Sequence, residues 1–130
     1  SATAAAPAPA VAPAPIVYQW RREWSEVYPK CDWTAIRGTV RDTFNNPVND
    51  VVVKTWNDWG NEFYSLAGYE SAAGDWSRSI GEGIKPGTWY VAVVDKETNQ
   101  PISPTYALRF TDSCGEGGVQ EVVIHFKMNY

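Results

Sequence analysis

From residue 34 onward, apolar and polar residues alternate with a period of two. The alternating segments are TAIRGTVRD, VVVKTW, NEFYSLAGYE, DWSRSI, TWYVAVVD, TYALRF and VQEVVIHFK. Such alternation places every second side chain on the same face of a β-strand. The stretches NNPVND, AAGD, KPGT and NQPISP lie between these segments and carry the Gly, Pro and Asn residues that tight turns require. The pattern therefore predicts an all-β chain of seven short strands, which is typical of a β-sandwich.

The same alternation predicts which side chains face the core. We expect an inward set of Val51, Val53, Trp89, Val91, Val93, Val122, Ile124 and Phe126. The neighbouring positions would then point outward, namely Val52, Trp56, Tyr90, Ala92, Val94 and Val123. These outward residues would form one contiguous apolar patch, which a monomer rarely exposes. The patch therefore needs a cover.

The segment YQWRREWSEVYPK, residues 18–30, precedes the alternating region and is ambiguous. Tyr18, Trp20 and Arg22 alternate as in a strand, whereas Trp20, Trp24 and Val27 have helical spacing. We expect an extended connector. The chain then divides into an Ala/Pro-rich arm with an aromatic connector, residues 1–33, and a β-sandwich domain, residues 34–130.

The stretch IRGTVRDTFNNPVNDVVVKTW, residues 36–56, carries a resemblance to a known family. Together with AAGDWSRSI and IKPGTWYVAVVD, it resembles the carboxypeptidase regulatory-like and transthyretin-like domains of secreted and cell-surface proteins. The resemblance covers residues 34–127 and implies a seven-stranded Greek-key β-sandwich that serves as a scaffold. Gly38 between Ile36 and Val40 would leave room for a large ring such as Trp76 or Trp89. A scaffold implies no activity, so function has to be argued from sites.

Charge and composition exclude several partners. The net charge of the 130 residues is −4, and acidic and basic residues are interspersed. Without a basic stripe, we expect neither nucleic acid nor an anionic membrane as a partner. No apolar run approaches the roughly 18 residues of a membrane helix, so we expect no membrane insertion. The first residue is Ser in a small-residue context, as after signal-peptide cleavage, which suggests a mature exported protein.

The chain has two cysteines, Cys31 and Cys114, and no Cys/His cluster of the kind that binds zinc. A disulfide is the favoured interpretation, and two buried free thiols are the alternative. Closing a loop of about 80 residues could stabilise the fold by about 4 kcal/mol. A disulfide would favour an oxidising, extracellular location, and we therefore expect a secreted or cell-surface protein.

The sequence offers little for catalysis or metal binding. The single histidine, His125, is more consistent with an ordinary strand residue than with a ligand or base, and related transthyretin-like enzymes need several histidines. Ser77, Ser79 and Ser113 have no activating histidine nearby. The aspartates lie singly at turns rather than at alternate positions of a calcium loop. We expect no enzyme activity, no metal and no cofactor.

Seven Trp and seven Tyr exceed what one sandwich core of this size needs. Three covers for the outward patch remain open: residues 16–30 of the same chain, a neighbouring copy, or a carbohydrate stacked on Trp56, Trp59 and Tyr90. The candidate interface or glycan face comprises Val52, Trp56, Trp59, Tyr90 and Val94.

The arm, SATAAAPAPAVAPAPIV, is rich in Ala and Pro and favours an extended, polyproline-like conformation. Such a segment suits β-augmentation or groove docking. The candidate assembly residues are Pro13, Pro15, Ile16, Val17, Tyr18 and Trp20. Docking into the next copy would build an open filament. The sequence thus predicts a subunit of an extracellular, pilus-like homopolymer joined by donor-strand or groove docking; a carbohydrate-binding or accessory module is the alternative.

Overall fold

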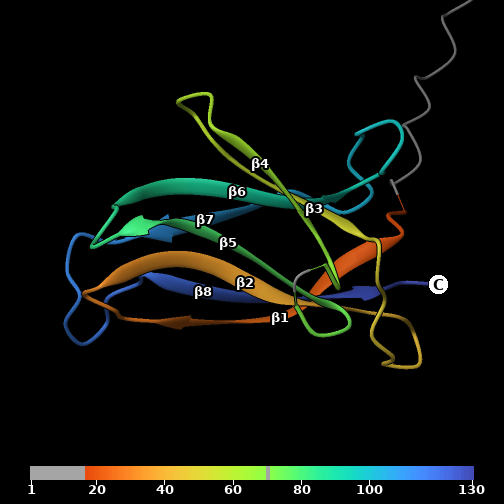
Figure 1. Ribbon diagram of the computed structural model, residues 1–130, viewed down its shortest axis with the longest axis horizontal. Helices are drawn as coiled ribbons and strands as arrows, with labels where there is room; N and C mark the ends of the chain where they lie inside the picture. Colours follow the sequence, from red (N-terminus) through yellow and green to blue (C-terminus); the bar gives the residue numbers. More distant parts are fainter. Residues whose placement is uncertain (1–16, 70) are drawn as a thin grey trace, which may run out of the picture.

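The protein folds into two layers of β-structure (Figure 1). A computed structural model describes residues 17–69 and 71–130, and these residues contain eight strands and no helix. The first sheet has the order β1 (Trp20–Tyr28), β8 (Glu121–Met128), β2 (Trp33–Arg41), β5 (Asp75–Glu82). The second has the order β4 (Glu62–Leu66), β3 (Val52–Asn57), β6 (Gly87–Val94), β7 (Tyr106–Phe110). The all-β prediction is confirmed.

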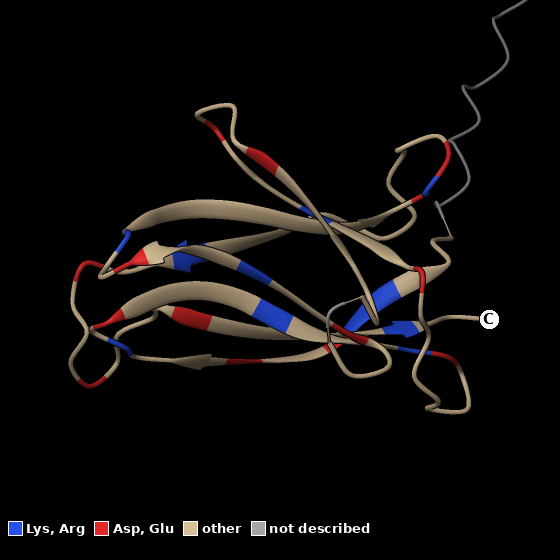
Figure 2. Cartoon of the chain, in the orientation of Figure 1, with Lys and Arg blue, Asp and Glu red and all other residues tan. Residues whose placement is uncertain are grey.

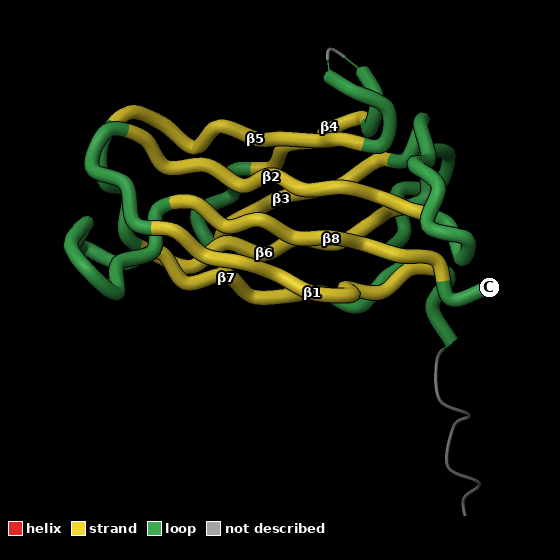
Figure 3. The backbone as a smooth tube through the Cα atoms, turned by 90° about the horizontal axis from the view of Figure 1, so that it is seen from below, coloured by secondary structure: helices red, strands yellow, loops and turns green. Residues whose placement is uncertain are grey.

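Each of the seven predicted segments contains a strand, and the eighth strand comes from the connector. Strand β1 pairs antiparallel with β8 and forms an edge of the first sheet (Figure 3). The predicted division at residue 33 therefore falls where β2 begins, between two strands of one sheet. The ladder between β1 and β8 shifts register between Arg22 and Trp24, as at a β-bulge.

The two central strands of the first sheet, β2 and β8, run parallel, and every other strand pair is antiparallel. Gly38 pairs with Ile124 across this parallel ladder. A Cβ at Gly38 would lie 1.6 Å from the carbonyl oxygen of Ile124. The glycine is therefore required by the close approach of the β8 backbone, not by an opposing ring as the sequence suggested.

The inner faces of both sheets share one hydrophobic core. Val53, Val91 and Val93 of the second sheet and Ile124 of the first are 0% exposed. Burying side chains of this size contributes about 1.5–3 kcal/mol each. The predicted inward set lies in or against this core, whose buried aromatic members are Trp20, Trp76, Trp89, Phe110 and Phe126.

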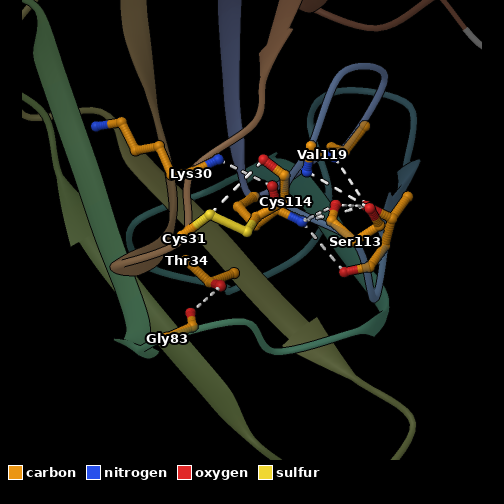
Figure 4. Close-up of a disulfide and its surroundings, with 10 residues drawn as sticks. Lys30, Cys31, Thr34, Gly83, Ser113, Cys114 and Val119 are labelled. Carbon is orange, nitrogen blue, oxygen red and sulfur yellow. Dashed lines mark hydrogen bonds between the residues drawn. A yellow bond between two sulfur atoms is a disulfide. The ribbon is translucent and has the colours of Figure 1, made fainter.

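A disulfide joins Cys31, in the connection between β1 and β2, to Cys114, in the loop before β8 (Figure 4). The two Cα atoms lie 5.1 Å apart, and 83 positions separate the cysteines in the sequence. The buried Gln120 side chain strengthens this junction by accepting from the Lys30 backbone N–H at 2.9 Å and donating to the Ser113 carbonyl at 2.8 Å. The predicted disulfide is confirmed, and it ties β1 to the rest of the fold.

Candidate functional site

The outer side of the second sheet carries a cluster of aromatic rings. Strands β3 and β6 place Trp56 beside Tyr90, and β3 and β4 place Lys54 beside Tyr64. We call Trp56, Trp59, Tyr64 and Tyr90 the aromatic face. The sequence singled out three of these rings as a glycan face, and the structure adds Tyr64 because β4 pairs with β3.

The rings pack against one another and against a cation. The centroids of the Trp56 and Tyr90 rings are 5.7 Å apart with an interplanar angle of 30°. The Lys54 Nζ lies 5.0 Å from the Trp56 ring centroid and 5.9 Å from that of Tyr64. Glu62 Oε1 lies 3.6 Å from the same ammonium group. Stacking and cation–π contacts of this kind contribute about 0.5–1.5 kcal/mol each and hold the rings in a defined orientation.

Trp59 occupies the turn between β3 and β4 and is 90% exposed. The Asn57 side-chain oxygen accepts hydrogen bonds from the backbone N–H groups of Trp59 and Asn61, both at 3.1 Å. Gly60 has a φ of +87°, which closes the turn in a conformation that favours glycine. The turn therefore holds its backbone in place while the indole faces solvent.

Polar groups surround the rings. Tyr90 donates its hydroxyl to Asp58 Oδ2 at 3.2 Å, and this hydrogen bond, assisted by the negative charge of Asp58, raises the pKa of Tyr90. The Tyr64 hydroxyl donates to Glu62 Oε2 at 3.3 Å and accepts from Asn99 Nδ2 at 3.0 Å. The aromatic face thus combines flat apolar surfaces with carboxylate and amide groups that can exchange hydrogen bonds with hydroxyls.

Part of the outward patch expected from the sequence is covered by the chain itself. Val94 is 2% exposed and Val52 is partly buried. Asn99, in the turn after β6, donates a hydrogen bond to the Tyr64 hydroxyl of β4. Because β3 lies between β6 and β4, this contact places the turn over one end of the face. Val123 lies on β8, in the other sheet. Ala92 and Val123, also expected to face solvent, are 0% and 3% exposed. The expected single patch is therefore divided, and Trp56 and Tyr90 remain as its partly exposed members beside the exposed Trp59.

Residues 17–30 do not cover the aromatic face, since β1 belongs to the first sheet. Pro13, Pro15 and Ile16 lie outside the described residues. Val17 is 72% exposed, and the carbonyl of Tyr18 accepts from Asn129 Nδ2 at 2.7 Å. Trp20 is 2% exposed, and its backbone N–H donates to the Ile102 carbonyl at 3.0 Å. Trp20, grouped with the assembly arm from sequence, thus packs in the core of its own chain.

Across residues 17–69 and 71–130, no group of three or more His, Cys, Asp or Glu side chains is placed to hold a metal ion. No helix in these ranges is long and apolar enough to span a membrane.

The sequence did not point to a polar hollow on the outside of the first sheet, where Trp24 and His125 meet. Trp24 was assigned to the connector and His125 to an ordinary strand position, so nothing local linked them.

A scan against protein-family models, a search of curated proteins and a search of solved structures each found no match for this chain.

Proposed function

We propose that this protein is a carbohydrate-binding module that holds sugar rings against its aromatic face. The observation that carries the proposal is the packed pair Trp56–Tyr90, with the 90% exposed Trp59 on the adjoining turn. The C–H faces of pyranose rings pack on flat aromatic rings, and an exposed tryptophan costs hydration free energy unless a ligand covers it.

The polar surroundings support a polyhydroxylated ligand. Asp58 and Glu62 accept hydrogen bonds from tyrosine hydroxyls of the face, and Asn99 donates to one. Sugar hydroxyls can join this network because each one both donates and accepts. A purely apolar partner would leave these groups desolvated without compensation.

The setting is part of the proposal. The disulfide is compatible with an extracellular location, and we propose that the module is secreted or displayed on a cell surface. We also retain the resemblance to carboxypeptidase regulatory-like and transthyretin-like domains, with its Greek-key connectivity and its scaffold role, as a proposal.

The test is retention on insoluble polysaccharides, namely cellulose, chitin and xylan, for the protein and the variants Trp56→Ala and Trp59→Ala. Trp33→Ala is the matched control, because Trp33 is also an exposed tryptophan but lies in the first sheet. We expect the two face variants to bind at least tenfold more weakly than the control on one of the supports. Equal retention of all variants, or no retention of the parent protein, would contradict the proposal.

A second candidate, a subunit of an extracellular filament, is favoured by the way the chain enters β1. Asn129 Nδ2 donates to the Tyr18 carbonyl at 2.7 Å, and the Asn129 backbone N–H donates to the Gln19 carbonyl at 2.8 Å. Tyr18 and Gln19 are therefore held at the end of the sandwich where the C-terminus also lies (Figure 1). Sixteen residues in a polyproline conformation would reach about 50 Å, enough to contact a neighbouring copy.

Assembly is tested by light scattering and negative-stain microscopy on the oxidised protein, with and without residues 1–16. Fibres or large oligomers of the full chain, and monomers of the shortened one, would support assembly. Two identical monomeric species would contradict it. Because the shortened protein keeps the aromatic face, its polysaccharide retention separates this proposal from the first.

A further inference from the structure

The outer side of the first sheet contains a hollow of about 320 Å³ lined by Glu23, Trp24, Thr39, Arg41, Asn45 and His125. Three neighbouring strands, β1, β8 and β2, supply most of its lining, and the turn after β2 supplies the rest. The register places Trp24 opposite His125 and His125 opposite Thr39. The register shift between Arg22 and Trp24 sets this alignment, because it leaves Glu23 unpaired and makes Trp24 the partner of His125.

One wall of the hollow is an aromatic stack. The Trp24 and His125 ring centroids are 3.9 Å apart, and Trp24 is still 48% exposed. Thr39 Oγ1 lies 2.7 Å from His125 Nδ1, so this hydrogen bond occupies Nδ1 and fixes the imidazole ring. Among the described residues, His125 Nε2 has no hydrogen-bond partner. The stack therefore offers a ligand both a ring surface and a free imidazole nitrogen.

The opposite wall carries a cation whose charge is not neutralised by a carboxylate of the described residues. Arg41 donates through Nη1 to the Asn45 carbonyl at 3.1 Å and makes no ion pair within 17–69 and 71–130. Its neighbours differ, since Arg37 Nε lies 2.9 Å from Glu121 and Lys127 Nζ lies 3.5 Å from Glu23. Arg41 is thus free to bind an anionic group through the remaining N–H donors of its guanidinium.

The hollow continues across the sheet. A second hollow of about 220 Å³ shares Thr39 and His125 and extends to Asp75 and Ser77 of β5. The two together form a trough that crosses all four strands, with an aromatic ring at the β1 end and hydroxyl and carboxylate groups at the β5 end. We call it the polar trough.

We propose that the polar trough binds an acidic sugar, such as a uronic acid unit of a polysaccharide, with its carboxylate on Arg41 and its ring against Trp24. The guanidinium fork matches a carboxylate in two parallel hydrogen bonds. Ser77 and His125 Nε2 lie further along the trough, where sugar hydroxyls would bind. Arg37 also lines the trough, but its charge is paired with Glu121. Glu23 and Asp75 line it as well, and their charges disfavour a doubly charged group such as a phosphate monoester.

This site is independent of the proposed function, because it lies on the other sheet and shares no residue with the aromatic face. The probe is trigalacturonic acid, titrated into the protein by calorimetry and by ¹H–¹⁵N NMR at low salt. Cellotriose serves as the neutral probe of equal length, and inorganic sulfate as the simple anion. We expect saturable binding of trigalacturonic acid, with shifts centred on β1, β2 and β8.

Arg41→Gln removes the charge, and we expect it to weaken trigalacturonic acid binding at least tenfold. Arg109→Gln is the matched control, because Arg109 is an arginine of β7 in the second sheet that likewise makes no ion pair among the described residues. Trp24→Phe, which keeps a smaller ring, is expected to weaken binding about threefold. Near-ultraviolet circular dichroism establishes that each variant is folded.

Four outcomes would overturn the inference: no saturable binding, equal loss in Arg41→Gln and Arg109→Gln, equal affinity for cellotriose, or complete competition by sulfate at the same concentration. Trp56→Ala should bind trigalacturonic acid as the parent does. If the parent protein binds trigalacturonic acid but is not retained on cellulose, chitin or xylan, the first proposal is contradicted and the acidic-sugar site still stands.

Discussion

The outer faces of the two sheets follow the same strand alternation and yet differ in chemistry. In the second sheet, the outward positions around β3 gather Trp56, Tyr64 and Tyr90, and β6 carries no charged residue along its whole length (Figure 2). In the first sheet, most outward positions hold arginine, glutamate, histidine, threonine or serine side chains, and Trp24 and Val123 are exceptions. The inner faces of both sheets contribute apolar side chains to one core. The core therefore makes the two sheets alike, and the outward positions make them different.

The difference also shows how each face is stabilised. On the first sheet, Glu121 is 7% exposed and forms ion pairs with both Lys30 and Arg37. Burial alone would raise the pKa of Glu121, but hydrogen bonds and charge from Lys30 and Arg37 outweigh it and lower the pKa. On the polar face the buried charge needs such partners, whereas on the aromatic face ring contacts are added to the hydrogen bonds and the Lys54–Glu62 ion pair.

Removing the disulfide should have the largest effect on stability, and this effect should differ between the two sheets. Replacing both Cys31 and Cys114 by Ser should lower the free energy of unfolding by about 4 kcal/mol, because the unfolded chain regains the entropy of a long loop. Chemical denaturation measures this loss. Hydrogen exchange should accelerate more in β1, beside the polar trough, than in β3 and β6. Equal acceleration of both sheets would show that the disulfide supports the whole fold rather than the β1 side.

Most of the fold could be predicted from sequence because the seven segments keep a period of two over most of their length, although the β2–β5 ladder shifts register between Thr34 and Ala35. Strand β1 does not. Trp20 points into the core and Trp24 points out, although four positions separate them, because the register shifts between Arg22 and Trp24. An extra residue in a strand reverses the faces that follow it, so the alternation of this segment could not be followed across the bulge.

The aromatic face was within reach of sequence reasoning, because the surplus of rings falls on alternating positions of neighbouring strands. The burial of Val94 could not be predicted from sequence, because the turn that covers it is held in place by a hydrogen bond from Asn99 to Tyr64 of β4. The polar trough could not be predicted from sequence either, for a different reason. Its residues come from β1, β2, β5 and β8, and the parallel pairing of β2 with β8 joins segments more than 80 positions apart.

A substitution at the centre of the first sheet should have the next largest effect. Gly38→Ala should cost about 3 kcal/mol or more, because its Cβ would overlap the Ile124 carbonyl, which the β2–β8 ladder cannot move cheaply. Gly115→Ala is the control, since the nearest atom to its Cβ is a serine oxygen at 3.7 Å, and it should change stability by less than about 0.5 kcal/mol. Thermal unfolding of both variants provides the comparison. Similar melting temperatures would mean that β2 and β8 can separate to admit a methyl group.

A smaller effect should appear on the polar face as a pH dependence. The pKa of Glu121 is lowered on folding, so its ion pairs stabilise the protein above the ordinary glutamate pKa, and this contribution is lost as the pH falls through the lowered value. Glu121→Gln should therefore cost about 1 kcal/mol at pH 7 and much less near pH 3. Denaturation at both pH values, with Glu62→Gln on the aromatic face as control, measures the difference. A loss of stability that is the same at both pH values would indicate a packing effect instead of a charge effect.

The smallest effect concerns the aromatic face and is spectroscopic. Because the Tyr90 hydroxyl donates to Asp58, with an additional effect of its charge, the pKa of Tyr90 is raised and its phenol should ionise at higher pH than an ordinary tyrosine. Asp58→Asn removes the charge and should move that ionisation back toward the ordinary value, while Tyr90→Phe should abolish it. Ultraviolet difference titration of the three proteins isolates this one phenol among the seven tyrosines.

Asp58→Asn keeps the side-chain shape and the Trp56–Tyr90 stack, so it also tests whether the face uses its carboxylate or only its rings to hold a sugar. If the Tyr90 titration is unchanged in Asp58→Asn, the hydrogen bond does not set the ionisation, and the aromatic face would contrast with the polar face more sharply, as a surface defined by ring contacts alone.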